Sequence, residues 1–264
     1  MVHGGEPVMR RFLKFLLVIF CCIGCAGETI KTGNLPVPNV PANDPALVPT
    51  SRSTRWWVTR HNERINEHII INQKVIFIGD SITHGYEFAG KDSWDEFNIR
   101  YGNRITNLGF SSDSTEHVIW RLENGEFPAG INPEYVVLMI GTNNKGSPGS
   151  TAAGIGRILR IINNRSPATR ILLFSILPSG EGVEDPDTIR NYEVNNIIKE
   201  YDGYLNIRYV DVARHYVNRS GALREELFAR DRLHLTSAGY TVWKNRIIET
   251  IRRWDRQRLN RQES

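Results

Sequence analysis

Five short apolar runs, separated by stretches with helical spacing, constrain the fold of this chain most strongly. The runs cover residues 75–79, 104–108, 135–140, 170–177 and 206–210. Between them apolar side chains recur at intervals of three and four residues, as in Ile155, Ile158 and Ile162, which is typical of a helix with one buried face. Because strand and helix alternate, we expect right-handed crossovers and a three-layer α/β/α sandwich with a parallel sheet of about five strands.

The N-terminal region has the composition of an export signal. From Met9, basic residues are followed by roughly a dozen apolar residues, which fits a signal peptide and is too short for a membrane span. All three cysteines, Cys21, Cys22 and Cys25, lie in this region, so the rest of the chain has neither a disulfide nor a cysteine metal site. We expect residues 1–26 to be a signal peptide and the protein to be exported, to the periplasm or the outer membrane surface.

The stretch CIGC at residues 22–25 resembles the bacterial lipobox, in which a small residue precedes a cysteine that is lipidated and becomes the new N-terminus. Gly24 fits this pattern, whereas Cys22 stands where leucine is usual. Two alternatives remain open, a lipoprotein anchored through Cys25 and an ordinary signal peptide cut near Ala26. We favour lipidation at Cys25.

The rest of the chain divides into three parts. Residues 27–52 contain five prolines and little apolar periodicity, which predicts an extended linker. The regular pattern starts near Ser53 and predicts one domain over residues 53–256, followed by a polar tail over residues 257–264. The formal net charge of +4 is too small to indicate a nucleic-acid partner, and acidic residues interrupt the C-terminal arginines, which favours a solvated helix face.

Polar side chains follow the apolar runs, at the edge where a parallel sheet holds its ligands. The segments are GDSIT (79–83), NLGFSSDST (107–115), GTNN (141–144) and DRLHLT (231–236). Together they supply a serine, a histidine, an aspartate and an asparagine, the groups that acyl transfer needs. Taken alone, Gly-Asp-Ser is more often a turn and a helix cap, and Asp231 with His234 could equally form a surface pair.

These four segments, in this order and spacing, resemble the SGNH hydrolases, also called GDSL-type esterases, over nearly all of residues 53–255. The connecting stretches are most similar to the platelet-activating factor acetylhydrolase subunits and their exported bacterial relatives; they read EHVIWRLENGE (116–126), LMIGTNN (138–144) and RNYEVNN (190–196). The resemblance implies the SGNH hydrolase fold, which is flavodoxin-like, and the activity of a serine esterase that needs no cofactor.

The resemblance also implies a catalytic triad. Ser81 corresponds to the nucleophile, His234 to the general base, and Asp231 to the carboxylate that orients the histidine. In the family, backbone N–H groups and an asparagine side chain form the oxyanion hole, and these donors correspond to Ser81, Ser112 and Asn143. Ser112 stands where the family usually has glycine, so the shape of its loop is expected to differ.

The resemblance further implies that the acyl pocket is lined by the residues flanking these groups, namely Ile82, Thr142 and Leu233. Two branched apolar side chains and a threonine leave little room around the reacting carbonyl. We therefore expect a preference for acetyl over longer acyl groups.

The remaining acidic residues and histidines near these segments are interpreted as structural. We expect Asp80 and Asp113 to be carboxylates that fix loops by accepting backbone N–H bonds. His84 is expected at the rim without a carboxylate partner, and His117 and His215 in structural positions. The histidine spacing does not match a zinc site, so no metal is expected.

Two classes of function follow from these residues. The first is a serine esterase acting on short acyl esters of a small molecule or glycan, most plausibly O-acetyl groups on carbohydrate, with a lipid-directed acylhydrolase as the enzymatic alternative. The second is a surface binding lipoprotein without chemistry, which the intact Ser81, Asn143, Asp231 and His234 disfavour. Membrane contact is expected only through a lipid anchor. The oligomeric state is open, and members of the family that the chain resembles include dimers.

Overall fold

The computed structural model describes residues 31, 33–66 and 72–262. The predicted signal peptide over residues 1–26, with Cys25, lies outside them, so export and lipidation stay predictions. None of the helices in the described residues combines the length and the apolar character that a membrane span requires.

Five parallel strands form the central sheet, in the order β2-β1-β3-β4-β5. The strands are β1 (Val75–Gly79), β2 (Ile105–Gly109), β3 (Tyr135–Met139), β4 (Arg170–Phe174) and β5 (Ile207–Val210). Each coincides with one of the apolar runs. Every residue of β1, β2 and β3 is buried, as expected for parallel strands covered on both faces. The predicted α/β/α sandwich is confirmed.

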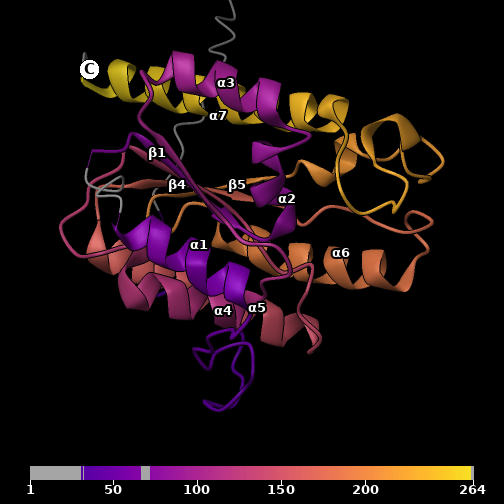
Figure 1. Cartoon of the computed structure of the whole chain (residues 1–264), viewed down its shortest axis with the longest axis horizontal. Helices are drawn as coiled ribbons and strands as arrows, with labels where there is room; N and C mark the ends of the chain where they lie inside the picture. Colours follow the sequence, from indigo (N-terminus) through magenta and orange to yellow (C-terminus); the bar gives the residue numbers. More distant parts are fainter. Residues whose placement is uncertain (1–30, 32, 67–71, 263–264) are drawn as a thin grey trace, which may run out of the picture.

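Helices cover both faces of this sheet (Figure 1). One face carries α3 (Lys91–Arg100) and α7 (Ser237–Gln262), and the other carries α1 (Arg55–Asn66), α4 (Thr115–Arg121), α5 (Pro148–Arg165) and α6 (Pro186–Ile198). The single turn α2 (Ser81–His84) directly follows β1. Short helical turns complete the connections, namely η1 (Gly85–Glu87), η2 (Leu122–Glu126), η3 (Lys199–Tyr201), η4 (Ala213–His215) and η5 (Glu225–Leu227).

The hydrophobic core has two halves, one on each face of the sheet. Ile76 and Ile78 point to the half that includes α4, α5 and α6, whereas Val75 and Phe77 point to the half under α7. This alternation follows from the two-residue period of a strand.

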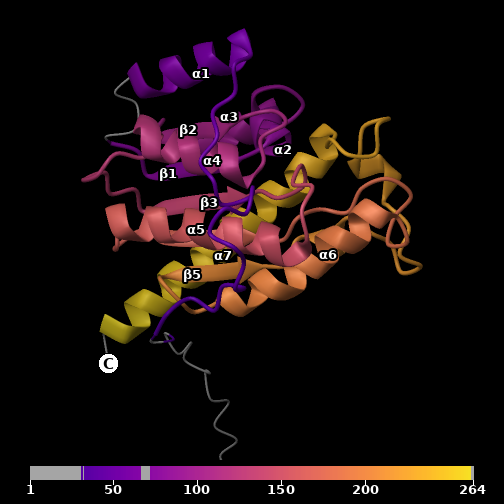
Figure 2. The same cartoon turned by 90° about the horizontal axis from the view of Figure 1, so that it is seen from below.

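Residues 33–52, which we call the strap, pack against the domain and do not form the predicted extended linker. In Figure 2 the strap, in indigo, runs across α5. Leu35 and Ala46 are each only 4% exposed, and the Thr115 hydroxyl donates to the Ala46 carbonyl over 3.0 Å. A Cβ on Gly154 of α5 would lie 2.7 Å from that same carbonyl oxygen. The linker prediction is therefore wrong for the strap, because apolar residues between its prolines are buried against small residues of α5.

The last helix is longer than predicted. α7 continues to Gln262, so most of the predicted polar tail over residues 257–264 is helical. Charged side chains one turn apart pair along it, as Glu249 does with Arg253, and such pairs support an exposed helix.

Candidate active site

Ser81 lies at the start of α2, in a tight turn that directly follows β1. Asp80 begins the helix, and its Oδ1 accepts the backbone N–H of Ile82 over 3.0 Å, which satisfies one of the free donors of the first turn. Gly79 allows the turn to approach β3, because a Cβ there would lie 2.4 Å from the carbonyl oxygen of Met139. The turn therefore depends on both residues that precede Ser81.

Asp80 is itself buried, and burial raises its pKa to about 7. Its second carboxyl oxygen, Oδ2, has no hydrogen-bond partner in the described part of the chain. The prediction that Asp80 accepts a backbone N–H is confirmed. Its carboxyl group remains mostly protonated below neutral pH.

Ser81, His234 and Asp231 form a continuous chain of hydrogen bonds. Ser81 Oγ lies 2.9 Å from His234 Nε2, and His234 Nδ1 lies 2.6 Å from Asp231 Oδ2. The other carboxylate oxygen, Oδ1, accepts the backbone N–H groups of Leu233 at 3.1 Å and His234 at 3.0 Å. With the Nδ1 proton directed at Asp231, His234 Nε2 can accept the proton of the Ser81 hydroxyl.

The Asp231 carboxylate at the end of this series of hydrogen bonds is ionised at neutral pH. Although partial burial by itself raises the pKa of Asp231, the hydrogen bonds from the His234 side chain and from two backbone N–H groups outweigh it and hold this pKa below its usual value. An ionised Asp231 can stabilise the imidazolium that forms when His234 accepts a proton.

The loop after β2 carries Ser112 in an unusual conformation. Ser112 is exposed and has φ +65°, the left-handed region that favours glycine. Asp113 is buried beneath it and accepts Trp57 Nε1 and Arg121 Nε, both over 2.8 Å. The prediction that Asp113 accepts backbone N–H bonds is therefore wrong, because its partners are side chains. The Asn143 side chain donates to the Asp113 carbonyl over 2.9 Å, which joins this loop to the loop after β3.

The sheet order explains why these loops meet. β1 lies between β2 and β3, so the loops that carry Ser81, Ser112 and Asn143 follow three adjacent strands at their carboxyl ends. The chain crosses from β2 past β1 to β3, and a reversal of strand order of this kind is where open α/β sheets bind their ligands.

A buried ion-pair network supports the loop after β2. Arg121, fully buried, binds both Asp113 and Glu126, and Glu126 Oε1 lies 2.8 Å from His61 Nδ1. The Arg121 guanidinium also lies 3.9 Å from the centre of the Phe110 ring. No local pattern predicts this network, although Arg121 and Glu126 lie in the EHVIWRLENGE stretch.

His84 has more partners than predicted. Its Nδ1 lies 2.9 Å from Ser111 Oγ, and its Nε2 lies 3.7 Å from a carboxylate oxygen of Glu87. Burial, with Arg60 nearby, lowers the pKa of His84 to about 4, so its ring is neutral in ordinary buffers. The Glu87 carboxylate, three residues later in the sequence, lies close but forms no ion pair with the neutral ring.

The residues predicted to line the acyl pocket differ in burial. Ile82 is 1% exposed and packs in the core under α7, so its side chain cannot line an open pocket and that prediction is wrong. The second position of α2 turns this side chain inward. Thr142 and Leu233 are half-buried, and their role stays a prediction.

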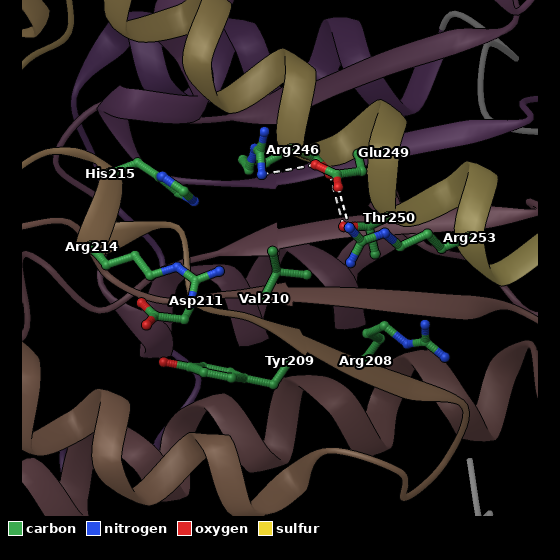
Figure 3. A pocket seen from close by; sticks show the side chains of 10 residues that line it. All are labelled: Arg208, Tyr209, Val210, Asp211, Arg214, His215, Arg246, Glu249, Thr250 and Arg253. Carbon is green, nitrogen blue, oxygen red and sulfur yellow. Dashed lines mark hydrogen bonds and ion pairs between the residues drawn. The ribbon is translucent and has the colours of Figure 1, made fainter. Parts of the chain in front are cut away.

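A hollow of about 290 Å³ lies between β5 and α7, away from these residues (Figure 3). Four arginines line it, Arg208, Arg214, Arg246 and Arg253. Glu249 pairs with two of them, Arg246 over 2.8 Å and Arg253. His215 lines this hollow as well. His117 is not part of it and instead accepts the backbone N–H of Ser114 at the start of α4. None of the lining residues belongs to the predicted active site, and no group of three or more histidine, cysteine or acidic side chains in the described ranges is placed to hold a metal ion.

Comparison with known proteins identifies the family. The chain matches the GDSL-like lipase/acylhydrolase family over residues 77–242. It is 32% identical over 208 residues to platelet-activating factor acetylhydrolase IB subunit alpha2 of Rattus norvegicus, covering 75% of this chain and 86% of that one.

Two solved structures share the fold at lower identity. A GDSL-like lipase from Bacteroides thetaiotaomicron superimposes with a TM-score of 0.53 at 19% identity, over 75% of this chain and 97% of that one. A mutant of an acetyl-xylooligosaccharide esterase from Geobacillus superimposes with a TM-score of 0.55 at 17% identity, over 67% of this chain and 93% of that one. The resemblance that the four segments indicated is confirmed: this chain is an ester-hydrolysing enzyme that belongs to the GDSL-like lipase/acylhydrolase, or SGNH hydrolase, family.

Proposed function

We propose that this protein is a serine esterase that removes short acyl groups, chiefly O-acetyl groups on carbohydrates, with Ser81 as nucleophile. The observation that carries the proposal is the chain of hydrogen bonds from Asp231 through both ring nitrogens of His234 to Ser81 Oγ, with lengths of 2.6 and 2.9 Å. A serine hydroxyl is a weak nucleophile until a neighbouring base removes its proton. This arrangement supplies that base and holds it in the required tautomer.

In the first half of the reaction, Ser81 Oγ attacks the ester carbonyl while its proton passes to His234 Nε2. The backbone N–H groups of Ser81 and Ser112 and the side chain of Asn143 stabilise the oxyanion that forms, and one such donor is typically worth about 10²–10³ in rate. His234 then gives the proton to the leaving alcohol. In the second half, a water molecule repeats the attack on the acyl-serine and releases the carboxylic acid.

The names of two relatives support an acetyl group as the acyl half of the ester. One is a platelet-activating factor acetylhydrolase subunit and the other an acetyl-xylooligosaccharide esterase. The first of these also supports the alternative function, hydrolysis of an acetylated lipid, because its identity to this chain is the higher of the two. The choice between glycan and lipid therefore depends on the alcohol half of the ester.

The proposal is tested by the rate of hydrolysis of p-nitrophenyl esters of increasing acyl length, with Ser81→Ala as the background. We expect kcat/KM to be highest for the acetate and to fall through butyrate to octanoate. Rates that rise steadily toward octanoate would contradict the short-acyl proposal.

We also propose that residues 1–26 direct export and that Cys25 becomes lipidated. The basic and apolar composition of this region supports export, and Gly24 before Cys25 supports lipidation. The mature protein should then partition into detergent, and Cys25→Ser should abolish this partitioning. A soluble mature chain that begins at Ala26 or Gly27 would favour the ordinary signal peptide.

A further inference from the structure

A polar hollow borders the proposed oxyanion hole on the side of Asn143. Its volume is about 400 Å³, within the range of small-molecule sites. Its walls come from three segments far apart in the sequence: the strap, the start of α4 and the loop between β3 and α5. The lining includes Asp44, Ser114, Glu116, Asn143, Lys145 and Ser147.

Hydrogen bonds fix the walls of this hollow. On the strap, Asp44 Oδ1 accepts the backbone N–H of Ala46 over 2.9 Å and the hydroxyl of Ser150. The Ala46 carbonyl accepts the hydroxyl of Thr115. Asn144 holds Thr115 in turn, since its Oδ1 accepts the Thr115 N–H over 3.1 Å and its Nδ2 donates to the Thr115 hydroxyl over 2.8 Å. The hollow is therefore organised before any ligand enters.

Two charged side chains in the lining are available to a ligand. Lys145 is exposed, and none of the hydrogen bonds or ion pairs within the described residues involves its ammonium group. The Glu116 carboxylate is half-buried, and its hydrogen bonds to the side chains of Thr115 and Asn144 are long, both 3.4 Å. A hydrocarbon chain in this hollow would desolvate such groups without replacing their hydrogen bonds, which is unfavourable. The hydroxyl groups of a sugar can donate to the carboxylate and accept from the ammonium.

We propose that this hollow is a sugar-binding subsite, in which an acetylated glycan places the ring that carries the ester. The inference rests on the proposed esterase function, because Asn143 belongs both to the hollow and to the proposed oxyanion hole. An acetyl carbonyl bound at Ser81, Ser112 and Asn143 leaves the alcohol half of the ester beside this hollow. Glu116 and Lys145 then bind the alcohol half through its hydroxyl groups, and a hydrocarbon chain is disfavoured there.

The test compares two substrates in Lys145→Ala and Glu116→Ala. The readout is the ratio of kcat/KM for an acetylated xylo-oligosaccharide to kcat/KM for p-nitrophenyl acetate, whose small leaving group cannot fill the hollow. We expect each variant to lower this ratio about five- to tenfold, mainly through KM, which is the size of one lost hydrogen bond. The matched controls are Lys199→Ala and Glu200→Ala, which remove exposed charges from η3 and should leave the ratio as in the wild type.

The outcomes separate the subsite from the esterase function. Three results would overturn the sugar subsite and leave the esterase function standing. Both variants could keep the wild-type ratio, or they could lower hydrolysis of a 2-acetyl glycerophospholipid instead. The third such result is a wild type that cleaves only p-nitrophenyl acetate. If the wild type hydrolyses none of these esters, the esterase function is wrong. NMR titration with unacetylated xylotetraose then decides the subsite: saturable binding weakened by Lys145→Ala and Glu116→Ala supports it, and no binding overturns it.

Discussion

Two histidine–carboxylate pairs in this enzyme have nearly the same geometry and opposite surroundings. His234 Nδ1 lies 2.6 Å from Asp231, and His61 Nδ1 lies 2.8 Å from Glu126. The side chains of the first pair are 42% and 52% exposed, and those of the second 7% and 0%. The first pair has the Ser81 hydroxyl on its second ring nitrogen. A histidine paired with a carboxylate therefore marks a candidate active site only where a nucleophile and a substrate can reach it.

The two regions should also differ in what they contribute to stability. An exposed pair such as His234–Asp231 is worth about 0–1 kcal/mol. The buried network around Arg121 holds two carboxylates that have no access to water, and loss of its cation would leave both uncompensated. Substitutions in the two regions should therefore separate activity from stability.

The largest effect is expected at the exposed pair. Asp231→Asn should lower kcat for p-nitrophenyl acetate by up to about 10⁴-fold, because an amide does not hold the required histidine tautomer or stabilise its cation. The free energy of unfolding should change by less than about 1 kcal/mol. A variant that keeps most of its activity would show that Asp231 is not needed for catalysis, and one that unfolds much more easily would show that the exposed pair stabilises the fold.

The next effect is expected in the buried network. Arg121→Met should lower the free energy of unfolding by about 3–5 kcal/mol, because Asp113 and Glu126 lose their common cation in the interior. Urea unfolding measures this loss. The control Arg219→Met changes an exposed arginine and should stay within about 0.5 kcal/mol of the wild type. Equal effects in the two variants would mean that the network does not stabilise the fold.

A smaller effect is expected at Asp80, a buried carboxyl without the cation that Asp113 has in Arg121. Its pKa is raised from 3.8 to about 7 in the folded protein, so between these pH values the folded chain holds a proton that the unfolded chain has released. The contribution of Asp80 to stability therefore falls as the pH rises from about 4 to about 7.

Asp80→Asn should remove this pH dependence. At pH 8 we expect the variant to be more stable than the wild type by on the order of 2–4 kcal/mol, and near pH 4 to be similar to it. Urea unfolding across this pH range measures the difference. Parallel stability curves for the two proteins would show that Asp80 is not the responsible group.

Local patterns in the sequence were sufficient for the sheet, whereas the proposed triad rests on the resemblance to the SGNH hydrolases. Each strand is a run of apolar residues, and buried parallel strands need no other signal. The polar segments after these runs carried Ser81, Asp231 and His234, because a sheet of this kind brings the ends of its strands together. The hydrogen-bond distances between these residues could not be read from the sequence.

The strap and the buried network could not be predicted, for a common reason. Prolines and polar residues in the strap are typical of a linker, and only the small residues of α5, such as Gly154, make room for it. Three residues of the network, Arg121, Asp113 and Glu126, are of charged types that usually lie at the surface. Their burial depends on contacts between segments far apart in the chain, which no local pattern reports.

Activation of Ser81 by His234 underlies the proposed function, and covalent labelling with a fluorophosphonate probe followed by intact-mass analysis measures it. We expect a single adduct on the wild-type protein, located on Ser81 by peptide mapping, and no adduct on Ser81→Ala. Labelling should also be much slower in His234→Gln, because the base is absent. Equal labelling of wild type and Ser81→Ala, or an adduct on another residue, would show that Ser81 is not the nucleophile.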